Sequence, residues 1–219
     1  MTTARDLFLT VVDQGPEHPV GQGDLSLALA GAELIDLVGA GAVAVELDRI
    51  RPGEPATYDG VLGEAAAGLV RQEPYERVED WLWRRGQDLA ATYQAALEQD
   101  GELTRQRGGR LSLGAKRVTP ADTPARRAAA DRWNEREPVL AALAAAVGIG
   151  AEEAVSEPEP EPEPEAGSES GAGSEFGGLG DEATTAVVAA VHDALMELEA
   201  VRQRRSIENA AFANLWRGP

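Results

Sequence analysis

The side chains that most often perform catalysis are sparse in this chain and are not grouped in the sequence. The chain has no cysteine, which excludes thiolate nucleophiles and cysteine-ligated metal sites. Its two histidines stand far apart, His18 in a proline-flanked segment and His192 in an apolar helical run. We expect a structural or solvent-facing role for both of them, rather than metal ligation or acid–base catalysis.

Two carboxylate pairs and two glycine-rich segments are the remaining candidates for acid–base catalysis or phosphate binding. Neighbouring side chains on a helix point in different directions, so Glu79–Asp80 and Glu152–Glu153 indicate solvated surface rather than an acid–base pair. The segments 21–23 and 39–41 lack the lysine and hydroxyl residue of a phosphate-binding loop. The sequence therefore predicts a protein that is not an enzyme and that uses no cofactor.

The most distinctive polar feature is a run of cations with no acid among them, called here the basic cluster: Arg105, Arg107, Arg110, Lys116 and Arg117. Such a cluster can attract anionic lipid headgroups, at about 1 kcal/mol per basic residue. It can equally be a solvated hairpin whose charges keep an exposed strand edge from pairing with other chains. Arg84 and Arg85 are two further candidates for a headgroup contact.

Turn signals predict a β-hairpin beneath the basic cluster. Apolar–polar runs at 103–107 and 110–113 flank the pair Gly108–Gly109, which is typical of a tight hairpin connection. Thr119–Pro120 is then expected to begin the next helical region, because proline is favoured at the first position of a helix.

Two tryptophans are candidates for side chains that insert at a membrane surface. Trp81 and Trp83 flank Leu82 and resemble a pair that inserts among headgroups. In a chain with only 5% aromatic residues, however, such side chains more often anchor the core.

Helical periodicity dominates the remaining sequence and predicts a mainly α-helical fold. Thr3 is expected to cap a first helix with Asp6 reaching back, and a long helix is expected over about 24–38. A strand at 43–47 follows, and the turn-rich segment 49–57 returns as a hairpin. The 219 residues are 43% hydrophobic, enough for one core built from leucine, valine and alanine.

Composition divides the chain into three parts. Residues 1–150 form the compact helical domain with its small β-hairpin. Residues 151–182 carry eleven acids and no base in Glu-Pro and Gly/Ser repeats, and they are expected to be a disordered acidic linker. Residues 183–219 form a C-terminal helix, with Asp181 expected as its cap and with a valine-rich apolar stripe. We expect this helix to dock on the main domain.

The net charge of −18 comes mostly from that linker and makes nucleic acid an unlikely partner, because phosphate neutralisation needs cations. The beginning of the chain lacks the pattern of a signal peptide. The longest apolar stretch, 139–148, is about half of what a bilayer requires. The expected location is cytoplasmic.

Several segments follow one another in a characteristic order: 6–9 (DLFL), 27–37 (LALAGAELIDL), 60–65 (GVLGEA), 78–82 (VEDWL) and 96–103 (ALEQDGEL). In their order and spacing, over roughly residues 3–148, they resemble the Golgi phosphoprotein 3 family, in the shorter form found in actinobacteria.

This resemblance implies a helical, non-catalytic domain that sits peripherally on membranes. In the family's eukaryotic members, such a domain recognises phosphatidylinositol-4-phosphate, oligomerises through a β-hairpin and captures the tails of resident membrane enzymes. The family's headgroup pocket falls near Gly21 or Gln22, at Ala30, near Gln87 and at Ala90, where this chain has neither a cation nor an aromatic ring.

We therefore expect a peripheral adaptor on the inner face of the membrane that meets anionic lipid through the basic cluster. Its further expected partners are a protein client and a second copy of the chain. The alternative is a soluble interaction scaffold that never meets lipid. A hydrolase without a known motif is the third alternative.

Overall fold

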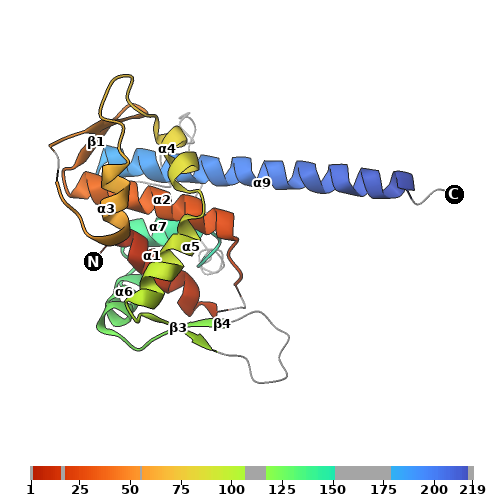
Figure 1. Cartoon of the computed structure of the whole chain (residues 1–219), viewed down its shortest axis with the longest axis horizontal. Helices are drawn as coiled ribbons and strands as arrows, with labels where there is room; N and C mark the ends of the chain where they lie inside the picture. Colours follow the sequence, from red (N-terminus) through yellow and green to blue (C-terminus); the bar gives the residue numbers. More distant parts are fainter. Residues whose placement is uncertain (1, 16–17, 55, 107–116, 151–178, 217–219) are drawn as a thin grey trace, which may run out of the picture.

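The computed structural model describes residues 2–15, 18–54, 56–106, 117–150 and 179–216 (Figure 1). It confirms the mainly α-helical class, and the described residues hold two small antiparallel hairpins. In chain order the elements are α1 (Thr3–Asp13), α2 (Gln22–Gly39), β1 (Val43–Glu46), β2 (Arg49–Pro52), α3 (Gly60–Ala67), α4 (Val78–Arg85), α5 (Leu89–Gln99), β3 (Leu103–Gln106), β4 (Arg117–Pro120), α6 (Pro124–Asn134), α7 (Pro138–Ala146) and α9 (Glu182–Trp216).

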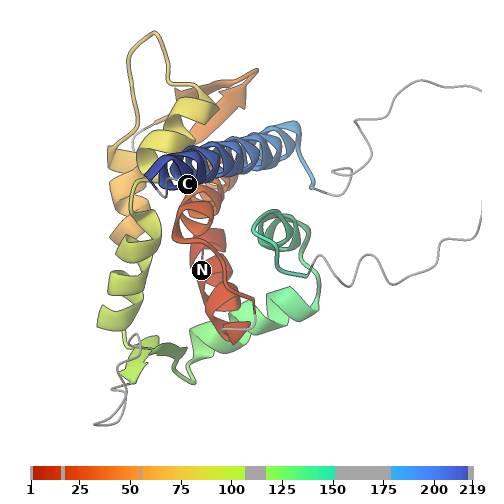
Figure 2. The same cartoon turned by 90° about the vertical axis from the view of Figure 1, so that its right-hand side faces the viewer.

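Helix α2 lies at the centre of the molecule. It contacts α1, α4, α5, α7 and α9, so that helices surround it along most of its length. Viewed nearly along α9, α1 and α2 lie between the α3–α5 side and the α6–α7 side, with α9 across them (Figure 2). Every residue of α2 from Leu25 to Ile35 is buried, which explains why its sequence is apolar on all faces.

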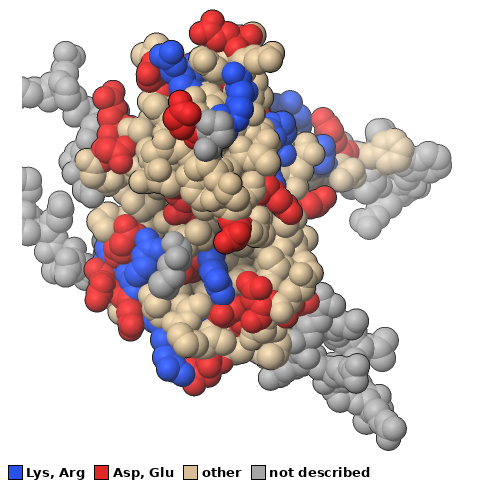
Figure 3. Space-filling view, turned by 60° about the vertical axis from the view of Figure 1, so that its left-hand side comes forward, with Lys and Arg blue, Asp and Glu red and all other residues tan. Residues whose placement is uncertain are grey.

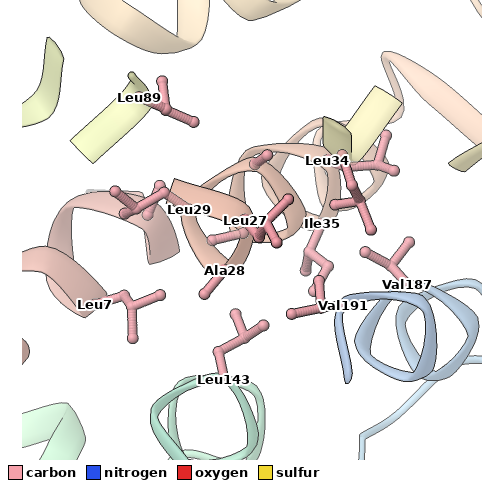
Figure 4. Close-up of a cluster of buried hydrophobic side chains, with 14 of the residues drawn as sticks. Leu7, Leu27, Ala28, Leu29, Leu34, Ile35, Leu89, Leu143, Val187 and Val191 are labelled. Atoms are coloured by element: carbon pink, nitrogen blue, oxygen red, sulfur yellow. The ribbon is translucent and has the colours of Figure 1, made fainter. Parts of the chain in front are cut away.

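The core is built around α2 from aliphatic side chains of several helices. Leu143 of α7 and Val187 and Val191 of α9 lie toward α2 in Figure 4, where Leu7 of α1 approaches Ala28. All of these side chains are less than 2% exposed. Close packing of small and branched aliphatic side chains thus fills a core in a chain with few aromatic residues.

The cap of α1 differs from the sequence prediction. Thr2, not Thr3, is the N-cap, and its hydroxyl accepts from Arg5 N at 3.3 Å. The carboxylate of Asp36 on α2 accepts from the amides of Thr3 at 2.9 Å and Ala4 at 3.2 Å. Asp6 does not reach back, because it is fully buried and pairs with Arg132 of α6. Asp36, which lies 33 residues from Thr3 in the sequence, thus accepts from amides at the start of α1 that a side chain of the same helix was expected to satisfy.

The first hairpin agrees with the sequence and the second does not. β1 pairs with β2 through a turn in which Leu47 has a positive φ of 58°. β3 pairs with residues 117–120, so Leu103 lies opposite Pro120. The sequence instead predicts 110–113 as the second strand. That segment lies outside the described residues. The hydroxyls of Thr104 and Thr119 lie 3.1 Å apart across the ladder, a cross-strand pair that supports this register.

The helix after this hairpin begins later than predicted. Thr119 and Pro120 end β4 rather than opening a helix, and α6 begins at Pro124. Thr123 caps α6, and its hydroxyl accepts from Arg126 N at 3.2 Å. Both Thr-Pro pairs carry the start signal, but the first is paired with Thr104 and Leu103 in the β3–β4 ladder, so the helix begins at the second.

Helix α9 docks with its first half and projects with its second. Asp181 caps it by accepting from Thr184 N at 2.7 Å, as the sequence predicts, and α9 packs against α2, α4 and α7. At 1.5 Å per residue its 35 residues span about 50 Å. All side chains from 202 to 209 are exposed, and Figure 1 shows the helix continuing past the body of the molecule. The predicted acidic linker lies almost entirely outside the described residues.

Gly31 is required where α9 crosses α2. A Cβ at this position would lie well inside van der Waals distance of Val191 Cγ2. We expect Gly31→Ala to reduce the free energy of unfolding by about 1–3 kcal/mol, because the overlap can be relieved only by moving α9. Urea denaturation measures this loss. Gly39→Ala is the matched control, since nothing lies within 4 Å of its Cβ. Equal stability of the two variants would contradict the close approach of the helices.

Candidate functional site

The β3–β4 hairpin, which carries the basic cluster, is anchored to the core at its base. Leu103 is 3% exposed, and the preceding residue, Glu102, binds two other elements. One carboxylate oxygen accepts from Arg5 Nη2 of α1 at 2.8 Å, and the other accepts from the hydroxyl of Thr123. These contacts fix where the hairpin leaves the body of the protein.

Two residues of the basic cluster lie on described backbone. Arg105 of β3 pairs with Val118, and Arg117 of β4 pairs with Gln106, so both lie toward the end of the ladder away from Leu103. Arg107, Arg110 and Lys116 lie outside the described residues. The hairpin thus places Arg105 and Arg117 on adjacent strands, one residue out of register with each other.

The structure does not bring the two arginines of α4 to this hairpin. α4 and the β3–β4 hairpin lie at opposite ends of the molecule in Figures 1 and 2. Arg84 donates to Glu76 at 2.7 and 2.8 Å and to the carbonyl of Gly68 at 3.2 Å. Its guanidinium also lies 5.2 Å from the ring centroid of Trp81. Arg84 therefore holds the loop before α4 against the helix.

Arg85 points into the protein and forms a buried cluster with Glu33 and Tyr93. Its Nε and Nη2 donate to the two oxygens of Glu33 at 2.8 and 3.0 Å, and Nη2 also donates to the carbonyl of Val61 at 3.0 Å. The Tyr93 hydroxyl donates to Glu33 at 3.1 Å. The side chain of Glu33 is fully buried and that of Arg85 is 16% exposed. Sequence reasoning missed this cluster, although an acid inside the apolar run of α2 was its signal.

Burial dominates the electrostatics of this cluster. Removal from water raises the pKa of Glu33, and the hydrogen bond and charge of Arg85 oppose that rise. Burial also raises the pKa of Tyr93, so its hydroxyl keeps its proton and remains a donor. All strong donors facing Glu33 are used within the protein, so the cluster joins α2, α4 and α5 and leaves no group free to act on a substrate.

The positions at which the family resemblance places a headgroup pocket do not form a cationic site. Ala30 and Ala90 are buried in the core, while Gly21 and Gln22 are exposed. α9 lies over this end of α2, where Arg202 donates to Asp24 at 2.8 Å. The described side chains here offer no free guanidinium for a phosphate group.

Trp81 belongs to the core, which agrees with the structural interpretation of the tryptophan pair. It is fully buried, and its indole donates to the carbonyl of Ala30 at 3.1 Å. Trp83 is partly buried and packs against the same core. Both histidines are exposed, as expected.

Several hollows lie on the described surface, and two of them are bounded by helices. One, of about 400 Å³, lies between α1, α3 and α5, where Arg5 is already paired with Glu102. The other, of about 310 Å³, lies between the β1–β2 turn, the start of α4 and the outer face of α9. Figure 3 shows acidic and basic side chains interspersed over one face. Within the described residues, no group of three metal-ligating side chains lies together, and none of the helices could cross a membrane.

We expect Arg85→Met to reduce the free energy of unfolding by about 3–5 kcal/mol at neutral pH, because it leaves Glu33 buried without its cation. The pKa of Glu33 then rises further, so the folded variant binds a proton at a pH where the unfolded chain does not. The variant therefore regains stability as the pH falls through that raised pKa, and it loses stability as the pH rises.

Urea denaturation across the pH range measures this effect, with the double variant Glu33→Gln, Arg85→Met as its control. The double variant carries no buried charge at either position, so most of the loss and its pH dependence should disappear. A loss in Arg85→Met that is the same at every pH would contradict the role of the buried carboxylate.

Comparison with known proteins identifies the family. A family model described as Golgi phosphoprotein 3 (GPP34) matches residues 4–211, from α1 into the projecting half of α9. The comparison with curated proteins gives no match. The match extends past the segments that suggested the resemblance, so it includes α9 as part of the family's domain. Because the match spans nearly the whole chain, and because the helical fold agrees with it, this protein belongs to the Golgi phosphoprotein 3 family, a family of non-enzymatic adaptors.

Proposed function

We propose that this protein is an adaptor that associates peripherally with the cytoplasmic face of a membrane through the basic cluster of the β3–β4 hairpin. The observation that carries the proposal is the placement of this hairpin. Its base is fixed to α1 and α6 through Glu102, and Arg105 and Arg117 lie on paired strands at the other end. An anchored hairpin can present cations together without a pocket.

The strength of such a contact is limited by its diffuse character. Five basic residues at about 1 kcal/mol each contribute at most about 5 kcal/mol, which supports reversible binding. Attraction of this kind requires anionic lipid and weakens with salt, because charges separated by more than about 10 Å are screened at 0.1 M ionic strength.

Arg84 and Arg85, which the sequence offered as further contacts, take other roles in this proposal. Arg85 is bound to buried Glu33, and Arg84 is bound to Glu76 at the opposite end of the molecule. We assign both of them to the fold. The membrane contact therefore belongs to the five residues of the basic cluster.

Replacing Arg107, Arg110 and Arg117 together by glutamate should abolish binding to anionic liposomes. The substitutions reverse three of the five cations, so attraction becomes repulsion, and circular dichroism should show an unchanged helical fold. Co-sedimentation with liposomes, with and without anionic lipid and at two salt concentrations, measures the loss.

A matched triple variant separates local contact from net charge. Arg49, Arg51 and Arg71 are exposed cations near the β1–β2 hairpin, and their replacement by glutamate changes the net charge equally. Their surface pairs contribute little to stability. This variant should still bind. Binding that survives in the first variant, or fails equally in both, would remove the basic cluster as the contact.

The wild-type protein should not prefer phosphatidylinositol-4-phosphate over other lipids when the vesicles carry equal surface charge. The reason is that Ala30 and Ala90 lie buried where a phosphate pocket would need cations. Competition between vesicles of matched charge measures the preference. A marked preference that persists at high salt would reveal a shaped pocket.

Absence of binding to any anionic vesicle at low salt would instead favour the soluble interaction scaffold. In that case the adaptor would act through a protein client alone, as the family assignment still allows.

A further inference from the structure

The hollow between α1, α3 and α5 has the size of a small-molecule site. Its volume of about 400 Å³ lies within the range of about 300–1,000 Å³ that is usual for such sites. Figure 2 shows α3 and α5 on the same side of α1. The first turns of α1 and α3 and the second half of α5 line the hollow. Because three helices bound it, the hollow suits a small molecule better than an extended chain.

The walls of this hollow are mainly apolar. Val61 and Leu62 of α3 are partly buried and pack against the core. Leu97 of α5 is buried, and Ala96 and the ring of Tyr93 line the hollow from the same helix. A ligand therefore needs an apolar body, because apolar walls are best covered by apolar groups that displace water from them.

The charge of Arg5 is already committed to the fold. Among the described residues that line the hollow, Arg5 is the only cation, and its Nη2 donates to Glu102 at 2.8 Å. Glu102 is 8% exposed, so moving Arg5 away would leave a buried carboxylate without its cation. The arginine therefore does not make the hollow a site for anions.

Two helix ends meet at the hollow with opposite partial charges. α3 begins there at Gly60, and α5 ends there at Gln99. The N-terminus of a helix carries about half an elementary positive charge, and the C-terminus carries about half a negative charge. These contributions oppose each other, so the helix ends do not decide the charge of the ligand.

Two aspartates at the rim supply the remaining charge. Asp59 stands just before α3 and Asp100 just after α5, and both are exposed. Asp59 makes no side-chain hydrogen bond to cap α3, although capping is the usual role of an aspartate at that position. Neither carboxylate takes part in an ion pair within the described residues. The uncompensated negative charge favours a cation.

We propose that this hollow binds a small organic cation, whose alkyl body lies along the apolar walls and whose primary ammonium group lies at the rim with Asp59 and Asp100. A primary ammonium has three hydrogen-bond donors, which suits carboxylates. A quaternary ammonium has no such donor and needs open aromatic faces, whereas the ring of Tyr93 is stacked with Phe8. The inference goes beyond the proposed membrane contact, and its test contains no lipid.

The probe is n-octylammonium chloride, and octanoate is the control with a similar chain and the opposite charge. Methyl NMR of the full chain, titrated with each compound, measures both the affinity and the place of binding. We expect saturable shifts at the methyl groups of Val61, Leu62 and Leu97. Octylammonium should bind about tenfold more tightly than octanoate, or better, because like charges at the rim repel octanoate.

The double variant Asp59→Asn, Asp100→Asn removes both charges and nearly preserves the shape of the rim. It should weaken the binding of octylammonium by about tenfold or more, because the ammonium loses its charged acceptors. The matched control is Asp80→Asn, Asp193→Asn, which changes the net charge equally at two exposed aspartates that do not line the hollow. This control should bind octylammonium as the wild-type chain does.

Ala96→Phe tests the apolar part of the site, because the larger side chain fills the hollow. Ala96 is only partly buried, so circular dichroism should show an unchanged helical content, and the methyl shifts should disappear. Equal affinity for octylammonium and octanoate would overturn the proposal. Equal losses in the two aspartate double variants would also overturn it, as would methyl shifts that are absent in the wild-type chain or persist in a folded Ala96→Phe.

Discussion

The burial of α2 from Leu25 to Ile35 is the constraint on which the rest of the structure depends. A helix surrounded by other helices must be apolar on every face, and any polar group that it carries must find a partner without water. Three side chains and one carbonyl of α2 do so with three neighbouring helices. Ser26 accepts from the first turn of α5, the Ala30 carbonyl and Glu33 accept from Trp81 and Arg85 of α4, and Asp36 accepts from the first amides of α1. The polar groups of α2 thus link it to α1, α4 and α5 by specific hydrogen bonds.

This use of polar groups also accounts for the absence of catalytic chemistry around Glu33. A buried carboxylate with a raised pKa beside an arginine and a tyrosine has the composition of an active site. However, Nε and Nη2 of Arg85 and the hydroxyl of Tyr93 all donate to this carboxylate, and the side chain of Glu33 has no exposure to solvent. The same groups in an open cleft could act on a substrate, whereas here they specify which helices meet. An adaptor needs a fixed shape more than it needs a reactive group, and that agrees with the family to which the chain belongs.

The arginines outside the core differ in whether an acid lies beside them. Most arginines of the helical body are tied to acids, as Arg84 is to Glu76 and Arg126 is to Asp13, so they contribute little to long-range attraction. The basic cluster differs from these arginines in sequence, because no acid lies between Arg105 and Arg117. This run of cations is the feature behind the proposed contact with an anionic surface.

The sequence by itself determined the helical class, the central helix, the first hairpin, the burial of Trp81 and the capped start of α9. Each of these depends on signals within a few residues: helical spacing, turn residues, or an aspartate before a helix. Only the tertiary structure decided which strand pairs with Leu103, which residue caps α1, and that Arg84 and Arg85 belong to the fold rather than to the basic cluster. These outcomes depend on partners such as Asp36, Glu33 and Pro120, which are distant in sequence. Local propensity cannot identify such partners, because it contains no information about which distant groups burial will bring together.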